Sequence, residues 1–171
     1  MHHMEHLLPY IAGFFDGEGC ISIQKHHGNG AYVLWVSITN TSPEPLRLMK
    51  EHWGGHFVLI RRHDPQSNIY RLYLSTRRAA TFIEDVLPYL IIKKPQAELA
   101  LEYVTHVDDC NRMYRHIKGK KGVQPLPPEV YVLRDVYMQR MREFNKRGRI
   151  LEPERTGDYS VLLATGSSIT E

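Results

Sequence analysis

The sequence feature that most constrains the fold is a change of hydrophobic period between residues 15 and 20. Over residues 7–15 the apolar residues follow the i, i+4, i+7, i+8 spacing of one helix face: Leu7, Ile11, Phe14 and Phe15. Residues 20–26 instead alternate apolar and polar side chains, which is typical of a strand with one buried face. Two glycines within residues 16–19 predict the end of the helix. This segment is therefore expected to be a helix, with Pro9 in its first turn, that leads directly into a strand.

The remaining periodicity predicts two hairpins separated by a helix. Strands are expected over residues 20–26, 32–39, 57–62 and 69–75, and the first hairpin turn at 28–30. Helices are expected from about 43 to 53, 77 to 88, 95 to 114 and 129 to 147. The order α-β-β-α-β-β-α, followed by extra helices, predicts an α+β fold with a four-stranded antiparallel sheet. Helices would cover one face of this sheet, and polar residues the other.

Length and composition predict a single domain over residues 1–148 and a C-terminal tail over 149–171. Hydrophobic residues make up 42% of the chain and charged residues 24%, as in ordinary soluble proteins. No apolar run reaches the roughly 18 residues of a membrane span, and no secretory signal pattern is present. The two cysteines do not suggest a disulfide framework. We therefore expect an intracellular protein, in a bacterial or archaeal cytoplasm or an organelle, without a membrane partner.

Charge is distributed unevenly along the chain, although the formal net charge is only +3. Residues 1–60 hold three Lys/Arg against five Asp/Glu, whereas residues 112–149 hold eleven against three. This pattern favours a polyanion-binding protein that also holds a cation near its N-terminal third. From charge alone, a solvated basic helix face explains the C-terminal part equally well.

Residues 11–19 carry the strongest functional signal. The segment Ile-Ala-Gly-Phe-Phe-Asp-Gly-Glu-Gly resembles the LAGLIDADG motif of homing endonucleases, and the following strand stands where that family has its first strand. The element order over residues 5–115 is also similar to that of the family, and residues 87–97 resemble the segment before its long C-terminal helix. The resemblance implies a LAGLIDADG homing endonuclease-like αββαββα core and a site-specific, intron-encoded type of DNA hydrolase.

The motif has a physical rationale in the size of its residues and in its charge. Small residues let two such helices approach closely, which brings the carboxylates at their ends together. Paired carboxylates repel each other, and divalent cations with oxygen ligands relieve the repulsion. A single motif therefore implies a homodimer that reads a pseudo-palindromic site of roughly 20 base pairs. The predicted dimer interface comprises Ile11, Ala12, Gly13, Phe15 and Asp16.

The resemblance also implies catalytic roles for three residues. Glu18 stands at the metal-binding acid of the motif, and the Gly17 carbonyl is a second candidate ligand. The expected ion is Mg²⁺, with Mn²⁺ or Ca²⁺ as substitutes. Lys93 matches the family's basic residue near the scissile phosphate, with Lys94 as a close rival, and Asn40 matches a polar residue that orders water. Without the motif, Glu18 would be read as a turn residue and Asn40 as a turn or N-cap residue.

The exposed face of the sheet supplies candidates for reading base edges in double-stranded DNA. These are the outward residues of the predicted strands: Ser22, Gln24, His26, Trp35, Ser37, Arg61, His63, Arg71 and Tyr73. The alternation leaves Arg62 open as a substitute for Arg61. Basic residues of the C-terminal third are candidates for phosphate contacts: Lys118, Lys120, Lys121, Arg142, Lys146, Arg147 and Arg149. For each residue, a solvated surface position is the alternative reading.

Other readings of the sequence are weaker. Cys20 with His26 and His27 lacks the spacing of a zinc site, and the strand pattern around His26 argues against an HNH nuclease. Residues 119–122 lack the spaced Gly-Lys-Ser/Thr of a Walker loop. The main alternative is a catalytically silent protein on the same fold, either an intron RNA maturase or a DNA-binding regulator. The carboxylate at Glu18 favours cleavage over this alternative.

Overall fold

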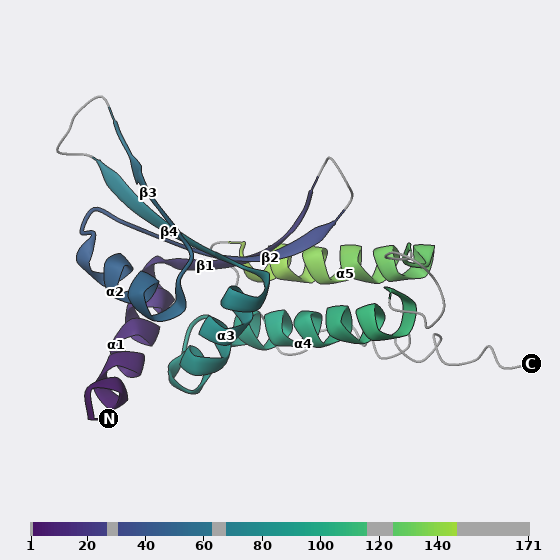
Figure 1. Ribbon diagram of the computed structural model, residues 1–171, viewed down its shortest axis with the longest axis horizontal. Coiled ribbons are helices and arrows are strands. Elements are labelled where there is room, and N and C mark those ends of the chain that lie inside the picture. Colours follow the sequence, from purple (N-terminus) through teal and green to yellow (C-terminus); the bar gives the residue numbers. More distant parts are fainter. Residues whose placement is uncertain (1, 27–30, 63–67, 116–124, 147–171) are drawn as a thin grey trace, which may run out of the picture.

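The computed structural model describes residues 2–26, 31–62, 68–115 and 125–146 (Figure 1). Their elements are, in chain order, α1 (His2–Glu18), β1 (Gly19–Lys25), β2 (Tyr32–Asn40), α2 (Glu44–Trp53), β3 (His56–Ile60), β4 (Ile69–Ser75), α3 (Thr76–Val86), the 3-10 turn η2 (Leu87–Tyr89), α4 (Lys94–Cys110), the π-helical turn η3 (Asn111–Arg115) and α5 (Pro128–Phe144). The predicted α-β-β-α-β-β-α order with further helices is confirmed, and with it the α+β class. The predicted turn at 28–30 and the tail at 149–171 lie outside the described residues.

The four strands form one antiparallel sheet in the order β1-β2-β4-β3. Val36 in β2 lies opposite Ile21 of β1 on one side and Leu74 of β4 on the other. In Figure 1 the helices lie together on one side of the sheet, and the β1–β2 and β3–β4 hairpins rise on the other side. The helix-free face is therefore curved between the two hairpins.

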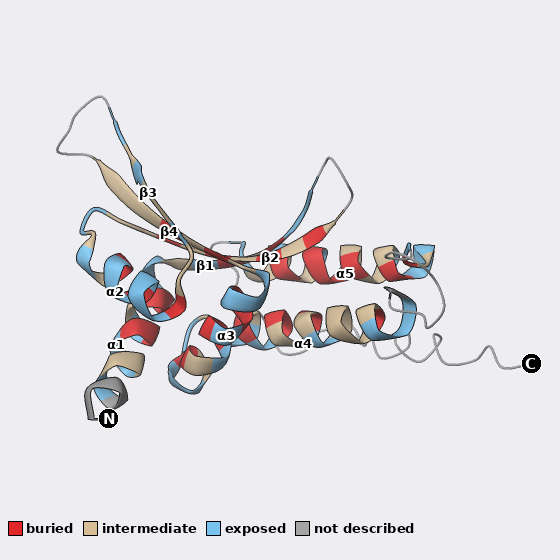
Figure 2. Cartoon of the chain, viewed as in Figure 1, coloured by how far each residue is buried: buried red, intermediate tan, exposed pale blue. Residues whose placement is uncertain are grey.

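Side-chain burial follows the alternation that the sequence predicts. In β2, residues alternate between buried and half-buried from Tyr32 to Ile38. Figure 2 shows buried residues both on the strands and on the helices that cover one side of the sheet. Leu34, Val36 and Ile38 belong to a core that also contains Ile11 and Phe15 of α1. Burial of this apolar surface provides the main driving force for folding. The core also fixes the register of the sheet, because a slip of β2 by one residue would move Leu34, Val36 and Ile38 to the opposite face.

Two details of α1 differ from the prediction. The helix begins before Pro9, which therefore lies inside it rather than in its first turn. It also continues through Gly17 to Glu18 instead of ending at residue 15. The chain then enters β1 at Gly19, where a Cβ atom would lie 2.6 Å from the Phe15 carbonyl oxygen and closer still to the Phe15 ring. A glycine is therefore required at this close approach of helix and strand.

The other helices agree with the periodicity to within a few residues. α2 ends at Gly54 and Gly55, whose φ angles of 74° and 95° are readily adopted only by glycine. The predicted helix 77–88 divides into α3 and η2, and Pro95 lies in the first turn of α4 as predicted. Among the described residues, no helix is long and apolar enough to cross a membrane. A single domain over residues 1–148 stays a prediction.

Candidate active site and nucleic-acid interface

The C-terminal end of α1 is held by a cluster of hydrogen bonds around Asp16. Its carboxylate accepts hydrogen bonds from three successive backbone N–H groups: those of Ile91 at 2.8 Å, Ile92 at 3.1 Å and Lys93 at 2.9 Å. Asp16 is only 8% exposed, so these bonds replace the water that its charge would otherwise bind. The residue joins α1 to the segment before α4 and has a structural role.

The side chain of Lys93 returns to the same helix end. Its Nζ donates a hydrogen bond to the backbone carbonyl oxygen of Asp16 and lies 6.0 Å from the centre of the Phe15 ring. Burial lowers the pKa of Lys93, while the negative groups of Asp16, Cys20 and Glu18 act in the opposite direction. The structure thus brings Lys93 to the end of the motif, and its catalytic role stays a prediction. Its rival Lys94 is exposed on the first turn of α4.

Glu18 is the last residue of α1 and is exposed, as is Gly17 beside it. Among the described residues, no group of three or more acidic, histidine or cysteine side chains could hold a metal ion. One chain therefore offers a carboxylate, a backbone carbonyl and a nearby ammonium at this place. These groups are suited to an oxygen-ligated cation only if further oxygen ligands come from elsewhere.

Asn40 lies at the end of β2, two residues beyond the Gly19–Ile38 pair that begins β1. Its Oδ1 accepts a hydrogen bond from the Ser42 backbone N–H at 2.8 Å. This is the local turn contact that asparagine commonly makes before a helix. The geometry therefore supports the turn reading of Asn40, and its catalytic role stays a prediction.

The predicted dimer interface needs correction. Ile11, Ala12 and Phe15 are all 0% exposed within a single chain, and Asp16 is engaged as described above. Only Gly13 of the five predicted residues is exposed, and a Cβ atom there would meet nothing within 4 Å. The amphipathic helix turns its larger apolar residues toward its own sheet. The exposed side of α1 instead carries Tyr10, Gly13 and Gly17.

The helix-free face of the sheet carries most of the predicted base-reading residues. Ser22 pairs with Trp35, Ser37 with Tyr73 and Trp35 with Ser75, so these side chains form neighbouring rows on that face. The Trp35 and Tyr73 rings meet edge to face at 6.1 Å. A hollow at one end of this surface is lined by Trp35, Gly55, His56, Tyr73, Ser75 and Arg78. His56 was not predicted because the strand was expected to begin at residue 57, and Arg78 was not predicted because it lies on α3 rather than on a strand.

The other DNA-binding candidates lie at the edge of the sheet, on α5 or outside the described residues. Gln24 is exposed on β1, and Arg142 of α5 lines a groove with Ser22 and Gln24, which places this arginine beside the sheet edge. Lys146 is exposed and forms an ion pair with Glu143. His26 follows the end of β1 and is exposed. The remaining candidates fall outside the described residues: His63, Lys118, Lys120, Lys121, Arg147 and Arg149.

Arg61 follows the end of β3 and is exposed, as is Arg62. In β3, Val58 pairs with Arg71 and therefore shares its helix-free face. Alternation then assigns Ile60 to that face as well. Arg61 and Arg62 lie beyond the last residue of β3, so the register does not choose between them as candidates for base reading.

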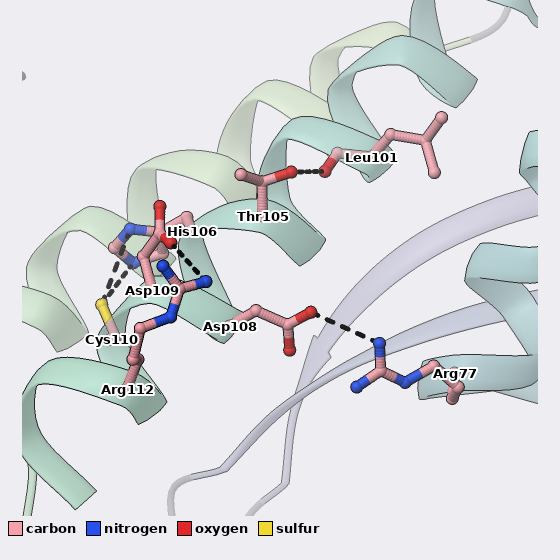
Figure 3. A network of polar contacts seen from close by, with 8 residues as sticks. All are labelled: Arg77, Leu101, Thr105, His106, Asp108, Asp109, Cys110 and Arg112. Atoms are coloured by element: carbon pink, nitrogen blue, oxygen red, sulfur yellow. Dashed lines mark hydrogen bonds and ion pairs between the residues drawn. The ribbon is translucent and has the colours of Figure 1, made fainter.

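A second polar cluster lies at the C-terminal end of α4 and consists of exposed ion pairs of the kind that stabilise a protein surface (Figure 3). Arg77 pairs with Asp108 and Arg112 with Asp109, each at 3.4 Å, and the arginine side chains are largely exposed. His106 and Cys110 lie one helical turn apart with their sulfur–nitrogen distances at 3.6–3.7 Å. Among the described residues, no third metal-ligating side chain groups with His106 and Cys110.

Comparison with known proteins agrees with this arrangement. Residues 5–86 match the model of a family described as a LAGLIDADG-like domain. Among solved structures, the homing endonuclease I-CvuI in complex with the I-CreI target is similar at a TM-score of 0.63 and 17% identity, over 99% of this chain and 100% of that chain. The archaeal intron-encoded homing endonuclease I-Vdi141I complexed with DNA is similar at a TM-score of 0.55 and 21% identity, over 94% of each chain. No curated protein sequence matches the chain.

Proposed function

We propose that this chain, whose residues 5–86 match the model of a LAGLIDADG-like domain and whose fold is similar to those of the homing endonucleases I-CvuI and I-Vdi141I, is a site-specific homing endonuclease that acts as a homodimer. Its reaction would be divalent-metal-dependent hydrolysis of one phosphodiester in each strand of a long pseudo-palindromic site. The observation that carries the proposal is the exposed Glu18 carboxylate at the end of a helix to which the Lys93 ammonium returns. These groups lie where α1 enters the sheet.

DNA binding is supported by the shape and chemistry of the helix-free face. That face curves between two hairpins, and it carries hydroxyl, amide, aromatic and guanidinium groups of the kind that bind base edges. The similar structures I-CvuI and I-Vdi141I were both solved with DNA. The major groove of DNA admits a two-stranded β-ribbon, whereas basic residues such as Arg142 at the sheet edge suit phosphate contacts.

The donor set of the chain is suited to a hard divalent cation that is shared with other partners. The Glu18 carboxylate and the Gly17 carbonyl would hold Mg²⁺, or Mn²⁺ or Ca²⁺ in its place, together with water and phosphate oxygens. When bound, such an ion activates water and stabilises charge on phosphate oxygens. I-CvuI structures were solved in the presence of Mg and of Ca. A second copy would supply the second carboxylate, which is the physical reason for proposing a homodimer.

Lys93 is proposed to act on charge at the reacting phosphate. Its ammonium is anchored on the Asp16 carbonyl, so it is held in position before the substrate arrives. Attack of water on phosphorus places additional negative charge on the phosphate oxygens, and a nearby ammonium stabilises that charge.

The experiment that tests the proposed function is cleavage of a randomised duplex library with Mg²⁺. Wild type is compared with Glu18→Gln and with Glu51→Gln, a matched control at an exposed carboxylate of α2. We expect double-strand cuts at one enriched pseudo-palindrome, abolished by Glu18→Gln and retained by Glu51→Gln. Selective binding without cuts in any variant would refute the nuclease proposal. It would favour a regulator or an intron RNA maturase, for which RNA binding is the next measurement.

A further inference from the structure

Arg71 occupies a central place on the helix-free face of the sheet. It lies in β4, a central strand, opposite Thr39 of β2 on one side and Val58 of β3 on the other. If this face enters the major groove, a residue on a central strand lies over the floor of the groove rather than over its phosphate walls. Arg71 is therefore placed for contact with base edges.

The guanidinium of Arg71 is held by neighbours on the same face. Its Nε donates to Thr39 Oγ1 at 2.9 Å, and its Nη1 donates to the Tyr73 hydroxyl at 2.9 Å. The Tyr73 ring is in turn packed edge to face against Trp35. A long arginine side chain normally loses considerable rotamer freedom when it binds, and these contacts restrict it beforehand.

The two hydrogen bonds leave part of the guanidinium available. Arginine has five N–H donors in a planar fork, so two used donors leave three, two of them on Nη2. Among the described residues, Arg71 has no carboxylate partner that would satisfy its charge. Guanine presents two acceptors, O6 and N7, in the major groove, and an arginine fork binds both at once.

We propose that Arg71 reads one guanine in each half-site, and that Thr39 and Tyr73 are the positioning residues that orient its guanidinium. This inference rests on the proposed function, because it requires the helix-free face to bind DNA. It assigns Thr39 a role that its sequence position does not indicate. It also predicts that the two-fold symmetric target contains a strongly preferred G·C pair at two equivalent positions.

The test is selection of bound duplexes from a randomised library, with Ca²⁺ in place of Mg²⁺. Variants are Arg71→Leu, Thr39→Val and Tyr73→Phe, with Thr39→Ser as a conservative variant that keeps the hydroxyl. Arg47→Leu, an exposed arginine on α2, controls for loss of a positive charge. We expect Arg71→Leu to weaken the preference at one position of each half-site roughly ten- to a hundredfold, with other positions unchanged.

Thr39→Val and Tyr73→Phe should weaken the preference at that same position by a smaller factor, and Thr39→Ser should restore it. A uniform loss of affinity across sequences in Arg71→Leu, with a salt slope reduced by about one, would identify a phosphate contact and overturn the inference. If Thr39→Val keeps the full preference for guanine, the positioning role of Thr39 is overturned. If wild type enriches no duplex, the proposed function fails as well; if it enriches a site that Arg71→Leu also selects, only this inference fails.

Discussion

Replacing Asp16 with alanine tests whether this residue joins α1 to the segment that carries Lys93. The substitution removes the acceptor for three backbone N–H groups, at distances of 2.8–3.1 Å. It leaves the backbone carbonyl to which Lys93 donates, but the carboxylate that orients residues 91–93 is lost. We therefore expect a loss of stability together with displacement of the Lys93 ammonium.

The magnitude follows from the number of bonds and from their exposure. Hydrogen bonds to a charged acceptor contribute about 1.5–3 kcal/mol each when buried, and ordinary ones about 0.5–1.5 kcal/mol. Ile91 and Ile92 are 84% and 67% exposed, so water can replace much of what the carboxylate provides to their N–H groups. The range for ordinary hydrogen bonds is therefore appropriate, and three such bonds give about 1.5–4.5 kcal/mol. For a chain of this size, this corresponds to a fall in Tm of about 3–18 °C.

Urea denaturation of Asp16→Ala, followed by fluorescence, measures the free energy of unfolding directly. Asp108→Ala is the matched control, because Asp108 pairs at 3.4 Å with the exposed Arg77 and should cost less than about 1 kcal/mol. Cleavage should fall more than DNA affinity, since Lys93 is displaced while the sheet face is intact. The reasoning is refuted if Asp16→Ala is no less stable than Asp108→Ala. Asp16→Asn, which keeps the side-chain volume, provides a second measurement if the alanine variant does not fold.

Three further predictions follow from individual contacts. Gly19→Ala should lower the free energy of unfolding, measured by urea denaturation, by at least about 2 kcal/mol, because the added Cβ would lie 2.6 Å from the Phe15 carbonyl oxygen. Gly13→Ala is the control: its Cβ would meet nothing within 4 Å, so the isolated chain should be as stable as wild type or slightly more stable. Arg134→Met should leave stability unchanged or raise it by about 1 kcal/mol or more, measured by urea denaturation, since Arg134 is 4% exposed and its Nε and Nη2 have no hydrogen-bond partner among the described residues. An NMR titration should show a lower pKa for Lys93 than for free lysine. Between that lowered pKa and 10.5, the unfolded chain binds the Lys93 proton and the folded chain does not. The free energy of unfolding of wild type, relative to that of Lys93→Met, should therefore rise with pH across this range.

The strands were predictable where one face of the sheet is buried. In β2, the residues assigned to the buried face, Leu34, Val36 and Ile38, are buried, and β4 was predicted at the bounds it has. Helix ends were less predictable. Gly17 indicated the end of α1, yet it stays helical, because glycine ends a helix only where the chain adopts a left-handed conformation. The steric constraint falls on Gly19, where the helix and strand approach each other most closely.

Contacts between distant segments explain most of what the sequence did not reveal about the site. The partners of Asp16 lie 75–77 residues further along the chain, so no local pattern indicates that its carboxylate is occupied. The same holds for the bond from Arg71 to Thr39, which lie 32 residues apart on neighbouring strands. Asn40 shows the opposite case: its partner Ser42 is two residues away, and the local turn reading available from the sequence describes the contact that it makes.

The dimer prediction assigned the small and apolar residues of α1 to one interface, although a helix has two sides. The apolar side packs on its own sheet, and the exposed side contains Gly13 and Gly17, one helical turn apart. In the proposed homodimer, a second α1 would therefore approach along these glycines, since neither presents a side chain that would hold the helices apart. Glu18 follows Gly17 directly, so close approach there brings the two Glu18 carboxylates toward the two-fold axis. A bulky residue at Gly17 should then weaken dimerisation and metal binding together, whereas Asp16→Ala should affect Lys93 without opening this interface.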